Sequence, residues 1–496
     1  MFVDGWTLEA AETVCAGDGI DQPDVLNLLG SLSTKSLLIA DVRTSETRYR
    51  LLETVQQYAW DRLIESGSAA DARRRHRDCY LALAERRAPE HPTKGYKWMV
   101  RPEWLDLLER EHGNLRAALQ WSAGESEGAD AELRLVAALG RFWDVRGYFA
   151  EGRHWLDHAL SRPAGSPWRV RKIAILGAAV LAARQGDLSL ARERTRVLLA
   201  KSRAVGDMPM VFDALLIHGM TLCEDEHYEP AAAVFEDALA VATDLKDDWR
   251  KAEILGEVGG SVAHGQGNDN LAVQRIEDSV TLFERLGHHA MAGYSRRSLG
   301  HVLRDRGDAE RAADLYAESL RRFRSGLGVT FAAVECVEGL AAVAVARGQC
   351  ERAARLFGAA DGFRRTLGFP RRSFDRPRHD ARVAAARTAV GPARFDAAFE
   401  DGRRMSLAEA VEYALVVAES GKPDAHASAK APRDGPLTPR EREVAGLIAR
   451  GQTNREIAAS LVISERTADA HVQNILNKLG FATRAQIAAW VAERGL

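Results

Sequence analysis

The stretch from residue 300 to residue 316, GHVLRDRGDAERAADLY, contains four positions that recur along the middle of the chain. Gly307 marks a turn between two segments of helical character. Gly300 stands seven residues before it, Ala312 five after it and Tyr316 nine after it. Two antiparallel helices approach closely only where the facing residues are small, and larger side chains then fill the flanks. The stretch therefore predicts a helical hairpin.

The same pattern occurs six times, with turns spaced by 39 to 41 residues. The predicted turn positions are Gly147, Gly186, Glu226, Gly267, Gly307 and Gly348. Small residues precede the turns by seven positions at Gly140, Ala179, Gly219, Gly260, Gly300 and Ala341, and follow by five at Gly152, Ala191, Ala231, Ala272, Ala312 and Ala353. Nine residues after the turn stand the larger Leu156, Phe235, Ile276, Tyr316 and Phe357, with Thr195 as the exception. The middle of the chain is thus an internal repeat.

This spacing resembles the tetratricopeptide repeat, whose usual period is about 34 residues, so the units look like a lengthened version of it. The resemblance implies helical hairpins stacked into a solenoid from about Ala131 to Leu367. Solenoids typically present a concave face to a protein, a peptide or a small effector. The alternative is an irregular helical bundle, in which the six coincidences would have no structural role.

Composition and length place the chain among multidomain helical proteins. At 496 residues it exceeds the size of a single core, and 46% apolar with 28% charged residues is an ordinary globular balance. Only 15 prolines and frequent Ala, Leu, Arg and Glu favour helices, so the predicted fold class is all-α. The net charge of -2 excludes a polybasic coat, so nucleic-acid contact has to come from a local patch.

Localisation follows from what the sequence lacks. The five cysteines are scattered without a C-x-x-C pair, which is typical of buried, reduced thiols. No apolar run approaches the roughly 18 to 20 residues that a membrane span needs, and the N-terminus lacks the pattern of a signal peptide. We therefore expect a cytoplasmic, nucleoid-associated protein without membrane contact.

The N-terminal region predicts a winged-helix-like module. Residues 36–42 and 47–51 are β-rich runs, and the following segment places Leu52, Val55, Tyr58 and Leu63 on one side of a helix. Further along, residues 421–436, GKPDAHASAKAPRDGP, have the composition of a flexible linker. The predicted domains are residues 1–130 (winged-helix-like and helical), 131–420 (helical repeats), 421–436 (linker) and 437–496 (DNA-binding).

Helix-capping signals divide the last 60 residues into four helices, predicted at 439–450, 454–461, 465–479 and 484–493. Capping boxes are formed by Thr438 with Glu441, Thr453 with Glu456 and Thr483 with Gln486, while Ser464 is a fourth cap and Gly451 and Gly480 are stops. The second and third helices form a helix-turn-helix. In the third, the predicted buried stripe is Ala468, Val472, Ile475 and Leu479, and the outer surface is Arg466, Asp469, Ala470, Gln473 and Asn477.

This segment resembles the LuxR-type helix-turn-helix family in LT-x-REREV, TNREIA, IS-x-x-T and KLGF. The resemblance implies that the third helix enters the major groove of double-stranded DNA. It also implies homodimerisation through the fourth helix, here by Ile487, Ala488 and Val491. The candidate DNA-binding residues are Thr453, Asn454, Arg455, Arg466, Thr467, Asp469, Ala470, Gln473, Asn477 and Lys478.

Asp469 departs from the family pattern, in which many members carry T-V-K where this chain has Thr467, Ala468 and Asp469. A carboxylate cannot make the phosphate contact of a lysine. It could accept from the amino group of cytosine, keep nonspecific affinity low, or face away from the DNA. Eight Lys or Arg against six Asp or Glu from Leu437 onward leave about +2, so counterion release should contribute modestly per monomer.

A second resemblance covers the first 130 residues. The segments GWTLEAAETVC, LLGSLSTKSLL, RLLETVQQYAWDRL and EREHGNLRAALQW are similar to the region that follows the nucleotide-binding core of STAND-type signalling ATPases. That family runs nucleotide-binding domain, winged helix, helical repeats and effector, so this chain is expected to begin after the ATPase core. Residues 30–36, GSLSTKS, lack the glycine that a phosphate loop needs before Lys35, and no nucleotide cofactor is expected.

Enzyme motifs do not emerge from the sequence. It contains no G-x-S-x-G elbow, no H-E-x-x-H and no convincing Cys-His pair, and His154 with His158 lacks a third metal ligand. The prediction is a non-enzymatic bacterial transcriptional regulator with an unknown protein or small-molecule effector on its repeats. The alternatives are a protein-interaction scaffold and a truncated STAND regulator whose ATPase domain is encoded upstream.

Overall fold

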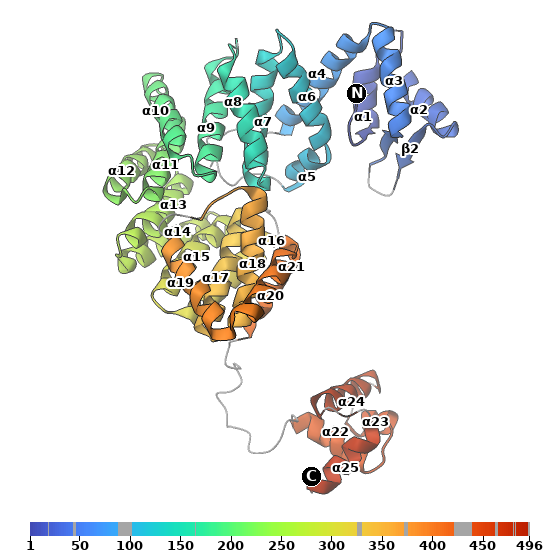
Figure 1. The fold of residues 1–496 in the computed structure, drawn as a ribbon, viewed down its shortest axis with the longest axis vertical. Coiled ribbons are helices and arrows are strands. Elements are labelled where there is room, and N and C mark those ends of the chain that lie inside the picture. The colour runs from blue at the N-terminus through green and yellow to red at the C-terminus, as the bar shows by residue number, and fades with distance from the viewer. Residues whose placement is uncertain are drawn as a thin grey trace. The chain divides into compact units, whose positions relative to one another are not determined.

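The computed structural model describes residues 1–17, 19–42, 46–87, 102–163, 165–324, 330–371, 375–420, 439–461, 465–479, 481 and 483–494. The chain divides into two compact units, Met1–Lys422 and Pro423–Leu496. The first unit is almost entirely helical and the second entirely so within its described residues, which confirms the predicted all-α class (Figure 1). The predicted linker, residues 421–436, lies outside the described residues.

A small three-stranded sheet marks the N-terminal module. It comprises β1 (Trp6–Thr7), β2 (Leu38–Asp41) and β3 (Arg48–Leu51) in the antiparallel order β1-β3-β2. Helices α1 (Leu8–Cys15) and α2 (Asp24–Thr34) precede the β2–β3 hairpin, and α3 (Glu53–Glu65) follows it. The two predicted strands are confirmed. The third strand was not predicted, because a two-residue strand is too short to show alternation.

The structure tests two further sequence features of this module, the apolar side of α3 and the segment around Lys35. The predicted apolar side of α3 is not buried: Leu52 is 47% exposed, Tyr58 is 64% exposed, and no residue of the helix is buried. The segment around Lys35 is the C-terminal end of α2, with Gly30 inside the helix. A helix has its backbone N–H groups bonded internally, so residues 30–36 do not form the loop that cradles a phosphate.

The module continues into the repeats without a break in packing. Helices α4 (Ala69–Arg87), α5 (Pro102–Arg110) and α6 (His112–Gly124) lead to α7, and all three contact it. The winged-helix-like module and the repeats therefore share one compact unit. A separate domain boundary near residue 130 stays a prediction.

The six predicted hairpins are present, and the two helices of each pack against one another (Figure 1). They are α7 (Ala129–Arg146) with α8 (Phe149–Ser161), α9 (Trp168–Arg184) with α10 (Leu188–Ala204), α11 (Met208–Glu224) with α12 (Tyr228–Asp244), α13 (Asp248–Glu257) and η1 (Val258–Ala263) with α14 (Asp269–Arg285), α15 (His289–Asp305) with α16 (Ala309–Arg324), and α17 (Thr330–Ala346) with α18 (Cys350–Leu367).

Every predicted turn position adopts the left-handed backbone conformation, with φ angles from 60° to 86° at Gly147, Gly186, Glu226, Gly267, Gly307 and Gly348. Glycine adopts this conformation without the steric cost that a Cβ imposes. A second series with positive φ, Gly206, Lys246, Gly287 and Gly368, ends the second helix of a hairpin. Its members stand 20 residues after Gly186, Glu226, Gly267 and Gly348, a fixed offset at which the sequence prediction named no turn.

The turns provide a direct test of the repeat geometry. Nothing lies within 4 Å of a Cβ added at Gly267, where φ is 74°, so Gly267→Ala should lower the free energy of unfolding by about 1 kcal/mol through backbone strain alone. The reverse change at the equivalent turn, Glu226→Gly at φ 60°, should cause no such loss. Urea unfolding of both variants measures this, and an unchanged midpoint for Gly267→Ala would contradict the assigned turn.

Small residues allow close helix contact inside the hairpins. A Cβ added to Gly219 would lie 2.4 Å from Phe235, and one added to Gly300 would lie 2.8 Å from Tyr316. The predicted pairing is wrong by one residue in the fourth unit, where Gly259 and not Gly260 faces the partner: its added Cβ would lie 2.8 Å from Ile276. The π-helix η1 accommodates one extra residue in this unit, whose turn follows the previous one after 41 residues, and shifts the helix register.

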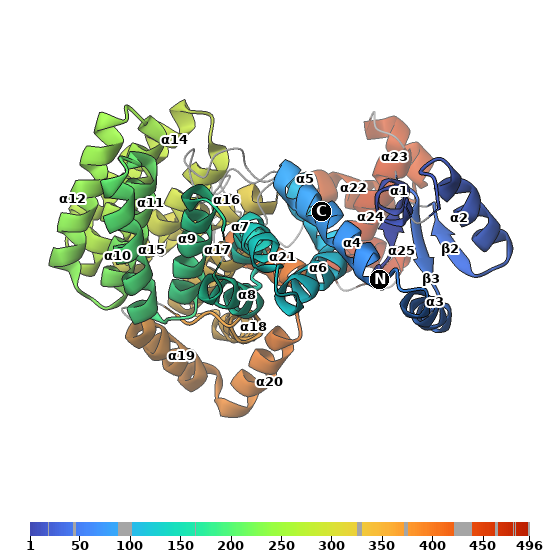
Figure 2. The same ribbon diagram turned by 90° about the horizontal axis from the view of Figure 1, so that it is seen from above.

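The solenoid curves until its ends meet, since α7 of the first hairpin contacts α17 of the last. Helices α19 (Arg376–Val390), α20 (Pro392–Arg403) and α21 (Leu407–Glu419) follow the hairpins, with α20 packed on α18 and α21 on α16, α17 and α18. Figure 2 shows α10 and α12 toward the rim of the curved array and α19 and α20 on one side of it. The first helices of the hairpins thus face the interior of the curve.

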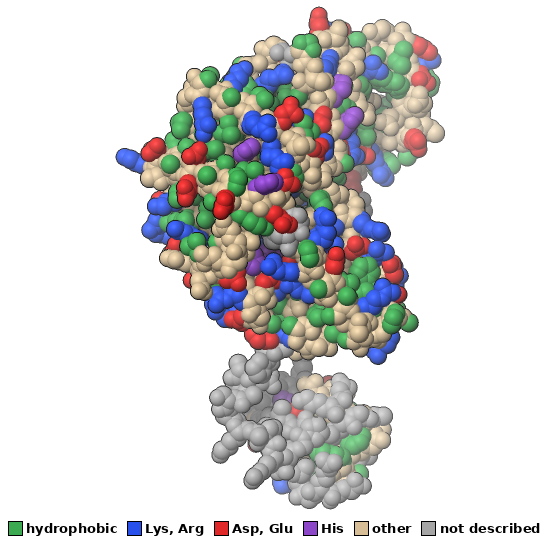
Figure 3. All heavy atoms as spheres, turned by 60° about the vertical axis from the view of Figure 1, so that its left-hand side comes forward, with side chains coloured by type: hydrophobic (Ala, Val, Ile, Leu, Met, Phe, Trp, Pro, Cys, Tyr) green, Lys and Arg blue, Asp and Glu red, His purple; other side chains and the backbone are tan. Residues whose placement is uncertain are grey.

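Within the described residues, no helix is long and apolar enough to cross a membrane. On the face of the first unit drawn in Figure 3, Lys and Arg side chains are interspersed with Asp and Glu, and neither sign forms a large patch. The five cysteines are free, and Cys223, Cys336 and Cys350 are buried.

Candidate nucleic-acid interface

Four helices form the second unit: α22 (Pro439–Ala449), α23 (Asn454–Leu461), α24 (Glu465–Leu479) and α25 (Arg484–Arg494). Their bounds agree with the predicted ones to within one residue. The core joins all four helices through Val444, Ile457, Ile475 and Ile487, which are fully buried. The predicted four-helix arrangement with a helix-turn-helix at its centre is therefore confirmed.

The local signals that end α22 and begin α23 are visible in the structure. The backbone N–H of Thr453 donates to Glu456 Oε2 at 2.7 Å, and the N–H of Glu456 donates to Thr453 Oγ1 at 3.3 Å, which forms the predicted capping box. The Thr453 backbone N–H, together with the Thr453 hydroxyl that donates to the same carboxylate oxygen at 2.9 Å, lowers the pKa of Glu456. Gly451 ends the preceding helix at φ 79°. The caps at Thr438 and Ser464 and the stop at Gly480 lie outside the described residues.

The recognition helix α24 presents two faces. Ala468, Val472 and Ile475 are buried, as the predicted stripe requires, and Asp469 and Gln473 are exposed on the other side. The side chains of six further predicted residues lie outside the described ones: Arg466, Thr467, Ala470, Asn477, Lys478 and Leu479. On α23 and just before it, Thr453 and Arg455 are exposed and Asn454 is half-buried.

Asp469 takes part in a chain of hydrogen bonds that crosses the helix-turn-helix. Asn454 Nδ2 on α23 donates to Asp469 Oδ1 at 3.0 Å, and Arg484 Nη1 on α25 donates to Asn454 Oδ1 at 2.5 Å. Arg484 also donates to the backbone carbonyl of Gln452. The carboxylate thus helps to fix α24 against α23, and Asn454 is held between the two charged groups.

The role of Arg484 was not predicted from the sequence. Its role depends on where the fourth helix begins in space relative to Asn454, thirty residues earlier, and no local pattern reports that distance. The Arg484 guanidinium is separated from the Asp469 carboxylate only by the Asn454 side chain. Its positive charge therefore offsets part of the negative charge on this surface.

The fourth helix differs from the expectation for a dimer surface. Ile487 is 0% exposed and Val491 is 3% exposed, and both pack into the core of their own unit. Ala488 and Trp490 are half-buried, and Ala489 is exposed. Since a side chain already buried in one subunit cannot also cover a second, an interface on α25 would have to use its outward residues instead of Ile487 and Val491.

Comparisons with known proteins identify this unit. The family described as bacterial regulatory proteins, luxR family, matches residues 435–491. Rv0890c of Mycobacterium tuberculosis, named as an HTH-type transcriptional regulator, is 25% identical over 659 aligned positions that cover all of this chain and 72% of that protein. The nitrate/nitrite response regulator NarL of Escherichia coli is 37% identical over 92 residues, covering 17% of this chain and 43% of NarL.

Two solved structures are similar to this chain at low identity. A Rap protein complexed with competence and sporulation factor has a TM-score of 0.41 at 15% identity, covering 68% of this chain and 99% of that one. A STAND protein with a tetratricopeptide repeat sensor, PH0952 from Pyrococcus horikoshii, has a TM-score of 0.39 at 13% identity, covering 79% of this chain and 62% of that one.

Together the fold and the family match define a class: a regulatory protein whose C-terminal domain is a DNA-binding helix-turn-helix. More particularly, residues 435–491 form a LuxR-type helix-turn-helix domain.

The charge of Asp469 should limit affinity for DNA of any sequence. Asp469→Lys is expected to add one phosphate contact and to steepen the slope of log K against log salt by about 0.9. Asp469→Asn keeps an oxygen that can accept from Asn454 while removing the charge, so it should raise affinity with little change in slope. Fluorescence anisotropy with a random-sequence duplex over a salt series measures both, and unchanged binding by Asp469→Lys would mean that this position faces away from DNA.

Proposed function

We propose that the chain is a sequence-specific DNA-binding transcriptional regulator whose helical repeats act as the sensor. The observation that carries this proposal is the exposed face of α24 on a folded LuxR-type unit. On that face, Gln473 offers an amide of the kind that pairs with adenine, and Asp469 offers a carboxylate that can accept from cytosine. Thr453 and Arg455, both exposed at the start of α23, would contact the phosphate backbone.

The repeats provide the second part of the proposal. The curved solenoid brings residues from hairpins far apart in the sequence to one interior surface, which suits the binding of an effector. An effector bound there would change how the C-terminal DNA-binding domains, residues 437–496, are presented to DNA. The predicted linker at residues 421–436 would set the effective concentration of these domains on DNA. The net charge of -2 agrees with confining DNA contact to the C-terminal domain.

Homodimerisation on DNA is the third part. A helix-turn-helix dimer reads two half-sites about one helical turn apart, or multiples of it. Because Ile487 and Val491 are buried, the proposed contact on α25 uses the side that carries Ala488, Ala489 and Trp490. We place the protein in the cytoplasm with the nucleoid, where its DNA target is.

The test compares duplexes that carry one or two copies of a selected half-site. The full chain should bind the duplex with two half-sites one turn apart at least about tenfold more tightly than the duplex with one, and half-turn spacing should abolish the gain. Sedimentation of the complex should give two chains per duplex. Equal affinity for both spacings would exclude the dimer while leaving DNA binding in place.

A scaffold without productive DNA binding is the competing function. Asp469 and the small net charge of the tail favour it, since both weaken attraction to phosphates. Deleting the repeats distinguishes the two roles, because a regulator that senses through them loses its effector response while its tail keeps DNA binding.

A further inference from the structure

A cavity of about 230 Å³ opens inside the solenoid. Its walls come from α7, α9, α11 and α17 and from the segment Phe369–Arg371 that follows the last hairpin. Residues from the first and the last hairpins therefore meet around one space, because the array curves back on itself. Cavities that bind small molecules usually join such distant elements around an apolar surface with a few polar groups.

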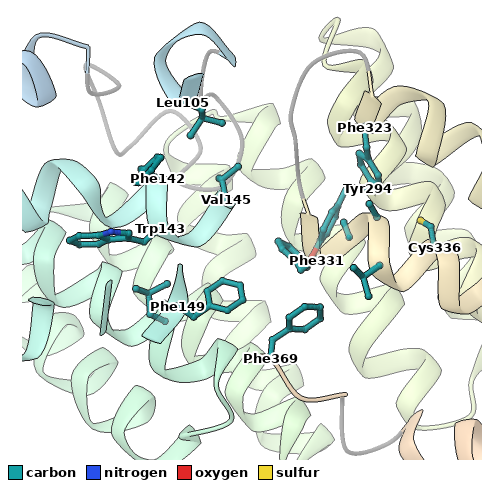
Figure 4. Packing of buried hydrophobic residues seen from close by; sticks show 14 of the residues in the cluster. Leu105, Phe142, Trp143, Val145, Phe149, Tyr294, Phe323, Phe331, Cys336 and Phe369 are labelled. Atoms are coloured by element: carbon teal, nitrogen blue, oxygen red, sulfur yellow. The ribbon is translucent and has the colours of Figure 1, made fainter. Parts of the chain in front are cut away.

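The wall of the cavity is apolar and partly aromatic. Its apolar lining includes Val180, Ile217, Met220, Phe331 and Phe369. Figure 4 shows the rings of Phe331 and Phe369 near one another, with Phe149 beside Phe369. The centroids of Phe149 and Phe369 lie 6.1 Å apart in an edge-to-face arrangement, which holds the Phe369 ring in place.

Most charged groups around this space are already paired inside the protein. Asp144 accepts from Arg184 at 3.0 Å, and the Arg184 guanidinium also lies 4.0 Å from the centre of the Phe331 ring. The carboxylate of Glu335 accepts from Arg297 at 2.6 Å. Asp225 is bonded to Arg192, and Arg371 to Glu338. Glu224, half-buried at the end of α11, is not free either, so these groups leave the wall with little net charge to offer a ligand.

Arg376 is the exception. It is the first residue of α19, it lines the cavity and it is exposed at its edge. Among the described residues, no carboxylate pairs with it. An arginine in this situation is a ready donor to a carboxylate or other oxyanion, which it can bind through two parallel N–H groups.

We propose that this cavity is the effector site and that it takes a small aromatic carboxylic acid, with the ring between Phe331, Phe369 and Ile217 and the carboxylate on Arg376. The volume is below the roughly 300 to 1,000 Å³ of drug-sized sites, which favours a molecule of one or two rings over a peptide. This inference deepens the proposed sensor role of the repeats and rests on it for its regulatory meaning.

Indole-3-acetate is the probe, titrated into the full chain by calorimetry beside tryptamine, which has the same ring system and the opposite charge. We expect one saturable site with a dissociation constant on the order of 0.1 to 1 mM for the acid, and at least about tenfold weaker binding of the amine. Arg376→Gln should weaken the acid by about tenfold or more and leave tryptamine unchanged. Arg169→Gln is the matched control, since Arg169 is exposed at the far end of α9 and does not line the cavity.

Ala183→Phe provides a second variant that fills the cavity from α9 and should abolish binding, with thermal unfolding used to establish that it folds. Absence of saturable binding, equal affinity for acid and amine, or full binding by both variants would overturn the proposal. The same preparations are assayed for DNA selection. A selected motif without ligand binding refutes only this inference, whereas ligand binding without DNA recognition refutes only the proposed regulator function.

Discussion

Replacing Gly358 by alanine is expected to lower the free energy of unfolding of the helical unit by about 3 kcal/mol or more. A Cβ at this position would lie 1.9 Å from the backbone carbonyl oxygen of Phe399, and a Cβ at Gly402 would lie 1.9 Å from that of Arg355. The clash is therefore reciprocal between α18 and α20, and it involves backbone that cannot swing away. Differential scanning calorimetry of the full chain should show the midpoint lowered by several degrees.

Gly30→Ala is the matched control, because Gly30 lies inside α2 with nothing within 4 Å of an added Cβ. Alanine there should stabilise by about 0.5 to 1 kcal/mol through helix propensity. If Gly358→Ala were as stable as the unmodified chain, the helices α18 and α20 could not be in the contact described.

The second large effect concerns recognition. Gln473→Ala should weaken binding to a selected duplex by roughly tenfold to a hundredfold, because one bidentate amide–base contact contributes about 1 to 3 kcal/mol. Binding to random DNA should be almost unchanged, and so should the salt slope, since a neutral side chain releases no counterion. Anisotropy titrations with selected and scrambled duplexes measure both quantities.

Asn474→Ala serves as the control for this variant. Asn474 is also an exposed amide on α24, but it lies one residue further along, about 100° around the helix from Gln473. Its removal should change selected binding by less than about threefold. Equal losses for the two variants would mean that the helix does not present the face carrying Gln473 to the bases.

Much of the fold could be predicted because its signals are local. A turn such as Gly307 needs left-handed backbone, and a hairpin needs a small residue such as Gly300 under Tyr316, so both recur in the sequence at fixed offsets. The closure of the array onto itself could not be predicted, since contact between α7 and α17 depends on small rotations summed over all hairpins. The shift from Gly260 to Gly259 was missed for a related reason, because the π-helix that causes it has no sequence signature in these residues.

Some features of the candidate DNA interface could likewise be predicted from the sequence, and others could not. Capping boxes and the apolar stripe through Val472 follow from helix geometry, and the sequence was sufficient to place them. The bond from Asn454 to Asp469 and the approach of Arg484 depend on how three helices pack. The burial of Ile487 likewise follows from packing, which is why a residue expected at a dimer contact lies in the core.

The most direct test of the central claim is selection from a random DNA pool by the full chain and by residues 437–496 over a salt series, followed by sequencing of the retained DNA. We predict one enriched motif common to both proteins, with affinity that falls as salt rises and with the motif lost in Gln473→Ala. No enrichment and no salt dependence would contradict a DNA-binding regulator and favour the interaction scaffold.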